Sequence, residues 1–96
     1  LPTATSNAPS TDRAQNVELV ITADGQYVIN GQTLINEKVS TLVQGLKEVT
    51  EGDFTRPLII TADAKASYDM VLRVYDAAAT LGITKLAHTA QKEPIQ

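Results

Sequence analysis

Cysteine is absent from the 96-residue sequence, and this absence removes several kinds of chemistry at once. Disulfide bonds, cysteine-ligated metals and thiol catalysis are excluded, while an oxidising compartment and the cytosol both stay compatible with the composition. Histidine occurs once, as His88, and no carboxylate lies near it in the sequence. We therefore expect an exposed or edge position for His88 rather than a catalytic or metal-binding role.

Other signatures of function are missing as well. The sequence has no glycine-rich phosphate loop, and no serine or threonine has a histidine placed to activate it. We therefore expect neither a catalytic site nor a bound metal or cofactor, and a binding or mechanical module rather than an enzyme. The net charge of −3 argues against a nucleic-acid partner. The basic residues are spread along the chain as Arg13, Lys38, Lys47, Arg56, Lys65, Arg73, Lys85 and Lys92.

Long apolar runs are also lacking. No stretch approaches the roughly 18–20 apolar residues that a membrane helix needs, and no signal peptide is visible. The chain begins at Leu1 rather than at methionine. We therefore expect that the chain is either processed or an excerpt of a longer protein, and what lies upstream stays open.

Composition divides the chain into three parts. Residues 1–16 are mainly Pro, Ser, Thr, Asn and Ala, which cannot bury enough apolar surface to offset the entropy of ordering. The sequence predicts a flexible tether over 1–16, a folded domain over 17–90 and a short flexible tail over 91–96. The domain is small, so its core should be marginal in size.

The first half of the domain has the pattern of a hairpin followed by a helix. Apolar residues alternate over 17–23, Asp24-Gly25 is a typical turn dipeptide, and the apolar segment 27–29 predicts the partner strand. Asn36 is a suitable cap for the next helix. Its apolar stripe is predicted to consist of Val39, Leu42, Val43, Leu46 and Val49.

The second half has the pattern of a strand–helix–strand unit. The apolar run 58–60 is typical of a strand covered on both faces. Ser67 is a suitable N-cap, Asp69 places negative charge in the first turn, and Gly82 ends the helix before a strand over 83–89. The spacing predicts that the buried side of this helix is formed by Tyr68, Val71, Leu72, Tyr75, Ala78 and Ala79.

These elements predict an α+β fold. A strand, a crossover helix and a second strand of this length imply parallel pairing with a right-handed connection. The order is β-β-α-β-α-β, and two helices on one face of a small mixed sheet would cover both apolar stripes.

Polar side chains near the end of the 58–60 strand are the best ligand candidates in the chain. Asp63 and Lys65 lie in the loop that follows this strand, where open α/β sheets often bind ligands. Asp69, Arg73 and Asp76 fall on one helix face, and we interpret this face as a solvated surface with ion pairs. A small-molecule-binding regulatory domain is therefore one open alternative. A pocket with convergent polar groups near Asp63 would favour it.

Several short motifs resemble the periplasmic domain of the ExbD/TolR family. They cover about residues 17–89: the strand ending in Ala62-Asp63, Tyr68 opening the helix, Asp76 within it, the closing segment LGITK over 81–85, and the upstream hairpin DGQY over 24–27. Leu1-Pro2 resembles the end of a segment between membrane helix and folded domain. The Ala62-Asp63 pair favours the ExbD branch over TolR. The segment Ala87-His88-Thr89 departs from the family by being more polar at a strand end.

The resemblance implies a subunit of a motor in the Gram-negative inner membrane, driven by the proton motive force. It implies one N-terminal membrane helix outside this chain, a homodimer whose membrane helices lie within an ExbB-like pentamer, and a periplasmic domain. That domain would bind a TonB-like energy transducer for outer-membrane nutrient uptake, and peptidoglycan as an anchor. A TolR-like subunit of the Tol-Pal system is the alternative within the family.

The strand over 17–23 is our candidate for partner binding. As the first strand of a hairpin directly after the tether, it is expected at a sheet edge, where unpaired backbone groups can pair with another chain. A plain structural strand is the equal alternative. The residues that we expect to contact a partner are Leu1, Pro2, Val17, Leu19, Val20 and Ile21.

Overall fold

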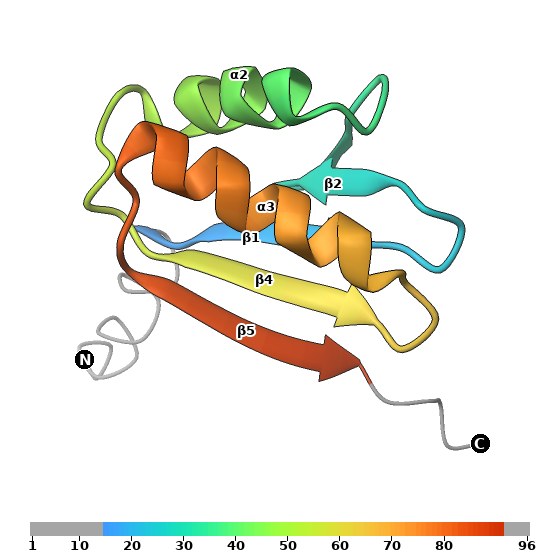
Figure 1. Ribbon diagram of the computed structural model, residues 1–96. Helices are drawn as coiled ribbons and strands as arrows, with labels where there is room; N and C mark the ends of the chain where they lie inside the picture. Colours follow the sequence, from blue (N-terminus) through green and yellow to red (C-terminus); the bar gives the residue numbers. More distant parts are fainter. Residues whose placement is uncertain (1–14, 92–96) are drawn as a thin grey trace, which may run out of the picture.

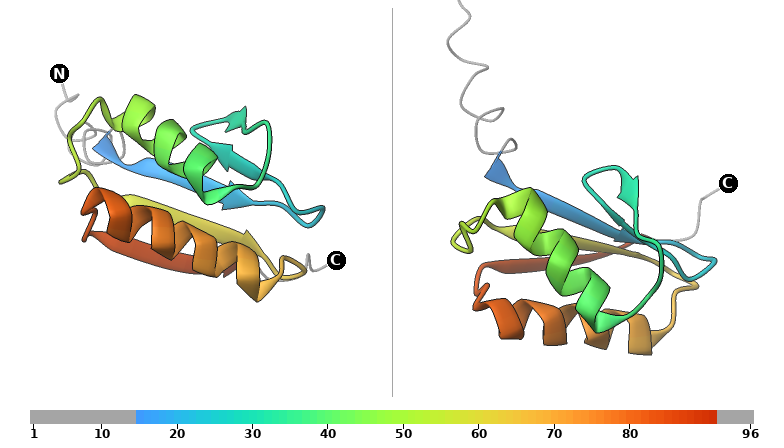
Figure 2. Two further views of the ribbon diagram at one scale, coloured as in Figure 1. Left: turned by 45° about the horizontal axis from the view of Figure 1, so that its top comes forward. Right: turned by 90° about the horizontal axis from the view of Figure 1, so that it is seen from above.

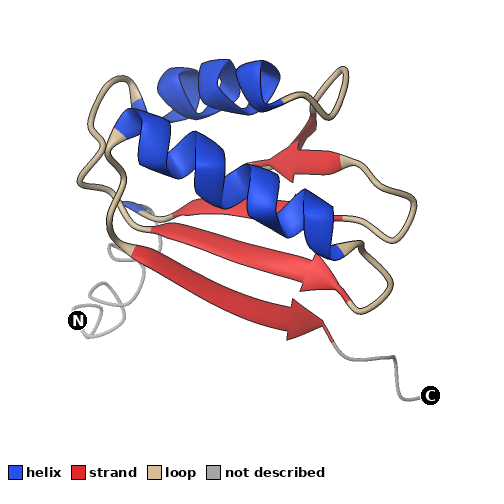
Figure 3. Cartoon of the chain, in the orientation of Figure 1, coloured by secondary structure: helices blue, strands red, loops and turns tan. Residues whose placement is uncertain are grey.

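The computed structural model describes residues 15–91, which form one α+β unit with two helices and a mixed sheet (Figures 1 and 3). The predicted fold class is confirmed, and the hairpin carries one additional short strand that the sequence analysis did not predict. The elements are β1 (Val17–Ile21), β2 (Tyr27–Ile29), β3 (Gln32–Thr33), α2 (Val39–Thr50), β4 (Leu58–Asp63), α3 (Tyr68–Leu81) and β5 (Leu86–Gln91).

The five strands are arranged in the order β3-β2-β1-β4-β5. β1 pairs antiparallel with β2 and parallel with β4, and β4 pairs parallel with β5. β1 therefore lies in the interior of the sheet, and the expectation that it forms an edge is wrong. The hairpin occupies only one side of β1, and the crossover through α2 brings β4 against the other side.

Both helices cover the same face of the sheet, as predicted (Figure 2). α3 begins and ends as expected: the Ser67 side chain accepts from the Met70 amide, and Gly82 adopts the left-handed conformation with φ 80°. The start of α2 differs from the prediction. Lys38, not Asn36, occupies the N-cap position, and its side chain does not cap the helix. Asn36 lies two residues before the N-cap, where its Oδ1 accepts a hydrogen bond from the Lys38 amide.

The buried side of α3 is rotated relative to the predicted stripe. Tyr68 is 73% exposed and Leu72 is 44% exposed, so neither is a core residue. The residues that do face the sheet are Met70, Val71, Val74, Ala77 and Ala78. The small side chains of Ala77 and Ala78 let the helix lie close to the strands, and Met70 and Val74 fill the remaining space.

A glycine allows the other helix to approach the sheet. A Cβ at Gly45 would lie 3.1 Å from Ile29 Cδ1 and 3.3 Å from Leu34 Cδ2, tighter than ordinary contacts. Gly45 lowers the intrinsic helix propensity of α2, and the close packing of the helix against the sheet that Gly45 allows offsets this cost. The predicted stripe of α2 is confirmed: Leu42 and Leu46 are fully buried, and Val39, Val43 and Val49 pack against the core.

Candidate functional site

β5 forms the long unpaired edge of the sheet. Within residues 15–91 its only strand neighbour is β4, in an unbroken register from Leu58↔Leu86 to Asp63↔Gln91. The Leu58 amide donates to the Lys85 carbonyl over 2.8 Å, which directs Lys85 towards β4. Because backbone groups alternate in direction along a parallel ladder, those of Leu86 and His88 point to the unpaired side.

This edge lacks the features that protect sheet edges in most proteins. β5 has the sequence LAHTAQ, with neither proline nor a charged side chain, and its register with β4 contains no bulge. The opposite edge is β3, which is only two residues long. β5 is therefore the part of the described sheet best suited to accept an added strand.

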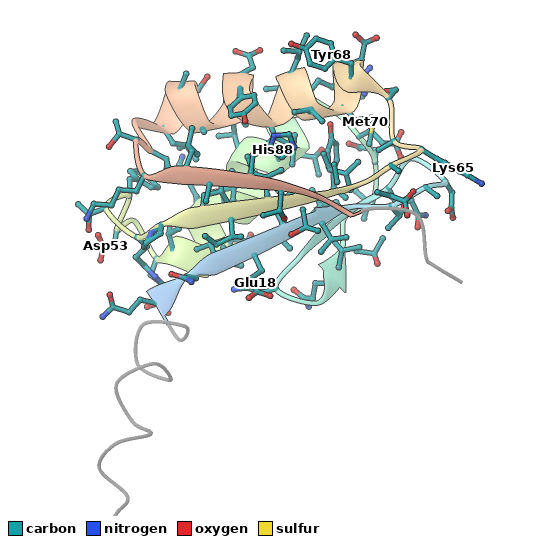
Figure 4. The ribbon with its side chains drawn as sticks, turned by 90° about the horizontal axis from the view of Figure 1, so that it is seen from below. Glu18, Asp53, Lys65, Tyr68, Met70 and His88 are labelled. Carbon is teal, nitrogen blue, oxygen red and sulfur yellow. The ribbon has the colours of Figure 1, made fainter. Side chains whose placement is uncertain are left out.

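His88 lies on this edge strand, in an exposed position as the sequence analysis expected. Its ring makes an edge-to-face contact with Tyr75, with ring centroids 6.3 Å apart and planes at 85°. Figure 4 shows His88 on the α3 side of β5, with Glu18 on the opposite face of the sheet. Within the described segment no three His, Asp or Glu side chains gather as metal ligands.

Of the residues predicted to bind a partner, three are buried, one is exposed and two lie outside the described residues. Val17, Leu19 and Ile21 point under the helices and are at most 1% exposed. Val20 is 38% exposed, on the face of the sheet that the helices leave uncovered. Leu1 and Pro2 lie outside the described residues.

Of the two ligand candidates at the end of β4, Asp63 lines a hollow and Lys65 does not. Asp63 lines a shallow hollow of about 260 Å³ on the uncovered face, together with Val20, Ile21, Thr22, Ala23 and Thr61. Lys65 is exposed and is not part of that lining, although its amide donates to Asp63 Oδ1 over 2.9 Å. The hollow is smaller than the usual 300–1,000 Å³ of a small-molecule site.

Arg56 fixes the place where the chain enters β1, a role that the sequence analysis missed. Its Nε donates to the Gln15 carbonyl over 3.0 Å, and its Nη1 donates to the Val49 carbonyl of α2 over 3.1 Å. The Val17 amide donates to the Pro57 carbonyl at the same point, over 2.8 Å. A charged side chain with several donors is suited to this role, but nothing in the local sequence identifies its acceptors.

Asp53 lies in the turn before Arg56, and hydrogen bonds from Thr55 stabilise its charged carboxylate. Hydrogen bonds from the Thr55 hydroxyl and amide hold the pKa of the Asp53 carboxyl below its usual value. This turn joins α2 to β4. The turn is followed directly by Arg56, whose side chain donates to the Gln15 carbonyl just before β1.

An exposed or edge position was expected for His88, but β5 as a whole was not identified as the candidate binding edge, although the sequence held a signal for it. Ala87-His88-Thr89 is more polar than a strand with two neighbours requires, and the structure shows all three residues exposed. A central parallel strand is typically apolar throughout, as the run Leu58-Ile59-Ile60 of β4 is. Polarity in the last strand of a β-α-β unit thus indicated which strand ends the sheet.

Comparison with known proteins gives a consistent family match. A family model described as Biopolymer transport protein ExbD/TolR matches residues 1–93. The chain is 29% identical over 93 residues to Biopolymer transport protein ExbD of Neisseria gonorrhoeae, covering 95% of this chain and 65% of that protein. It is 28% identical over the same span to ExbD of Neisseria meningitidis serogroup B, with the same coverage. The chain thus spans about 65% of the length of these relatives. Within residues 15–91, neither helix has the length and apolar character needed to cross a bilayer.

Proposed function

The chain belongs to the ExbD/TolR family of biopolymer transport proteins, and from this premise we propose that it is the periplasmic domain of an inner-membrane motor subunit driven by the proton motive force. In this proposal the domain binds a TonB-like energy transducer for outer-membrane nutrient uptake and has no catalytic activity of its own. One N-terminal membrane helix anchors the subunit within an ExbB-like pentamer. The ExbD names of the curated relatives support this branch over a TolR-like role in the Tol-Pal system.

The unpaired edge of β5 is the observation that carries the proposal. A TonB-like partner that adds an extended segment to this edge gains main-chain hydrogen bonds without a preformed pocket. The edge offers the outward backbone groups of Leu86 and His88, and the exposed Leu86 side chain supplies apolar contact. Val20 on the uncovered face, and Leu1-Pro2 in the preceding segment, complete the partner-binding residues in this proposal.

The strand arrangement also suits the transmission of force. β1, β4 and β5 run parallel to one another with β4 in the middle (Figure 2), and Arg56 donates to the Gln15 carbonyl where the chain enters β1. A pull from residues 1–16 therefore acts along β1, and a partner strand on β5 would resist it along the same axis. Such a load shears many backbone hydrogen bonds together rather than separating them one at a time. The buried side chains Val17, Leu19 and Ile21 act in this scheme by keeping β1 in place.

Homodimerisation uses the same edge in our proposal. Two copies of β5 can pair antiparallel about a twofold axis, which extends the sheet across the dimer. Because each β5 has one unpaired side, self-pairing and partner capture compete for it. Raising the concentration of the domain should then weaken the apparent affinity for the partner segment.

Proline at position 88 tests strand addition with little disturbance of the existing ladder. The His88 amide points outward, so His88→Pro removes a donor from the unpaired side and leaves the pairing with β4 intact. His88→Ala removes the ring and its contact with Tyr75 but keeps the amide. We expect that titration with a peptide from the periplasmic linker of the TonB-like partner shifts the amides of β5 in NMR spectra. His88→Pro should abolish these shifts, and His88→Ala should preserve them.

Two results would contradict the proposal. One is peptide binding that leaves β5 unperturbed, and the other is equal affinity for the His88→Pro and His88→Ala variants.

A peptide from the corresponding Tol-system partner tests the TolR-like alternative, because tighter binding of that peptide than of the TonB-like peptide would favour it. A titration with soluble peptidoglycan fragments tests whether the domain also binds peptidoglycan, which the family resemblance implies. The regulatory-domain alternative has less support, because the hollow at Asp63 measures only about 260 Å³.

A further inference from the structure

The side of α3 that faces beyond β5 carries a seam of uncharged residues that the described chain leaves largely uncovered. Its members follow one another at spacings of four, three, four and three: Tyr68, Leu72, Tyr75, Ala79 and Gly82. This is the spacing of a helix that packs against another helix. The sequence analysis placed four of these residues on the buried side of the helix, yet Tyr68 is 73% exposed and Leu72 is 44% exposed.

The seam is directed past the β5 edge. Tyr75, at its middle, contacts the His88 ring of β5, and α3 is the crossover that joins β4 to β5. With 3.6 residues per turn, the seam lies about 120° round the helix from the side that packs on the sheet. Figure 4 shows His88 between β5 and α3, and Tyr68 on the far side of α3 from the sheet.

No charged side chain belongs to the seam. The charged residues of α3 are Asp69, Arg73 and Asp76, and all three lie outside it. The ion pairs that we predicted among them are not formed within the described residues, and Arg73 Nη1 lies 3.6 Å from Met70 Sδ instead. An uncharged seam can be buried against another apolar surface without leaving a charge unpaired.

Side-chain size is graded along the seam. The N-terminal half carries the large residues Tyr68 and Leu72, and the C-terminal half carries the small residues Ala79 and Gly82. A second copy of the helix in antiparallel orientation places the large half of each helix against the small half of the other. A twofold axis near Tyr75 brings Tyr68 opposite Gly82 and Leu72 opposite Ala79, and it does so at both ends of the contact.

Antiparallel self-pairing of β5 produces this orientation. A twofold axis perpendicular to the sheet keeps the helices of both copies on one face and makes the two α3 helices antiparallel. Because α3 joins β4 to β5 and lies over them, the two α3 axes are separated by roughly two strand spacings, about 10 Å. Packed helices lie about 8–10 Å apart. The contact of Tyr75 with His88 brings the middle of α3 and the middle of β5 to the same axis.

We propose that the seam of α3 packs against the same seam of a second copy, beside the paired β5 strands. The inference rests on the proposed self-pairing of β5, and it identifies the contact that favours a second copy over other occupants of that edge. A second copy covers both the strand edge and the seam. An extended partner segment pairs with β5 but brings no helix to cover Tyr68 and Leu72. Changes in the seam should therefore weaken the dimer and leave partner capture intact.

A charge placed in the seam tests the contact. Leu72→Glu should raise the dissociation constant of the dimer about tenfold or more, measured by sedimentation equilibrium of the 96-residue protein. Thr80→Glu makes an added charge at an exposed position of the same helix outside the seam, and should change that constant less than about twofold. Equal constants for the two variants, or a native protein that stays monomeric at about 1 mM, would overturn the proposal.

An exchange of sizes tests whether Leu72 faces Ala79. Ala79→Leu sets two leucines against each other and Leu72→Ala leaves a gap, so each should raise the dissociation constant about fivefold. The double variant restores one large and one small side chain at each contact and should return to within about twofold of the native value. Both residues are good helix formers, so the monomer should keep its fold. Losses that simply add in the double variant would refute the antiparallel contact.

His88→Pro separates this inference from pairing at β5. It should abolish the dimer, because it removes an outward amide of the edge strand. A dimer that His88→Pro abolishes and Leu72→Glu leaves unchanged would refute the seam contact while β5 self-pairing stands. A dimer that survives His88→Pro would refute both. In the peptide titration Leu72→Glu should still shift the β5 amides, and a loss of peptide binding would show that the seam serves the partner segment instead of a second copy.

Discussion

β1 and β5 are both parallel neighbours of β4, yet they have opposite environments. β1 has a strand on each side, and Val17, Leu19 and Ile21 are at most 1% exposed. β5 has a strand on one side, and its residues from Leu86 to Thr89 are all exposed. One strand holds the domain together, and the other has backbone groups available for a partner. The strand that stabilises the core and the strand that we propose for binding are thus different strands of one sheet.

The environments of β1 and β5 show that position along the chain does not determine position in the sheet. The first strand in the chain lies in the interior of the sheet, and the last strand lies at its edge. In the proposed function the domain is pulled through β1, and this arrangement resists the load because β1 has a neighbouring strand on each side. The comparison can be tested by perturbing each strand in turn.

The largest expected effect is the loss of core volume in β1. Leu19 is fully buried, so Leu19→Ala should lower the free energy of unfolding by about 2–5 kcal/mol. Leu86→Ala in β5 is the matched change at a side chain that is 38% exposed, and it should cost less than about 1 kcal/mol. Urea denaturation followed by circular dichroism measures both. Similar losses in the two variants would mean that the strands do not differ as described.

The sequence predicted the hairpin partner of β1 and the parallel pairing of β5 with β4, but not the pairing of β1 with β4. The alternation, the cap at Ser67 and the stop at Gly82 depend on residues close together in the chain. The structure confirms the cap and the stop of α3, and it confirms the alternation over Val17–Ile21, while the predicted strand end Ala23 is exposed beyond β1. Sheet order depends on pairing between distant segments, which periodicity does not encode. The rotation of α3 was missed because Tyr68 and Leu72 lie at core spacing just as Met70 and Val74 do, and only the fit against the sheet distinguishes the two faces.

The next effect concerns backbone pairing within β5. Thr89→Pro should remove an amide that points towards β4 and cost about 1–3 kcal/mol, because it leaves a carbonyl of β4 without its ladder hydrogen bond. His88→Pro should cost less than about 1 kcal/mol, since that amide points outward. Thermal or urea unfolding of the two variants provides the measurement. A larger loss for His88→Pro than for Thr89→Pro would show that the alternation assigned to β5 is reversed, and with it the proposed binding side.

A smaller effect is expected on the other side of β1, where Ile21 pairs with Tyr27 of β2. Tyr27→Phe removes the hydrogen bond to the Met70 carbonyl and should cost about 1 kcal/mol near neutral pH. Because burial raises the folded-state pKa of Tyr27, its neutral form contributes stability below the unfolded pKa of about 10. That contribution is lost as pH rises through the folded pKa. Unfolding free energies measured from pH 8 to 11 should therefore fall more steeply for the native protein than for Tyr27→Phe, and parallel curves would contradict this.

The smallest expected effect is at the hydroxyl pair that joins β4 to β5. Thr61 Oγ1 and Thr89 Oγ1 are 3.2 Å apart in an exposed position on the uncovered face. Thr89→Val keeps the β-branched shape and removes one hydroxyl, and water can satisfy the Thr61 hydroxyl that is left. We expect the free energy of unfolding to change by less than about 0.5 kcal/mol.

Val20→Thr makes the reverse exchange on β1, at a side chain that is 38% exposed, and should change the free energy of unfolding by less than about 1 kcal/mol. Denaturation of both variants measures how strongly the uncovered face supports the fold. A loss above 2 kcal/mol in either variant would show that this face is part of the core. In that case the contrast between an enclosed β1 and an accessible β5 would hold only for the side of the sheet that faces the helices.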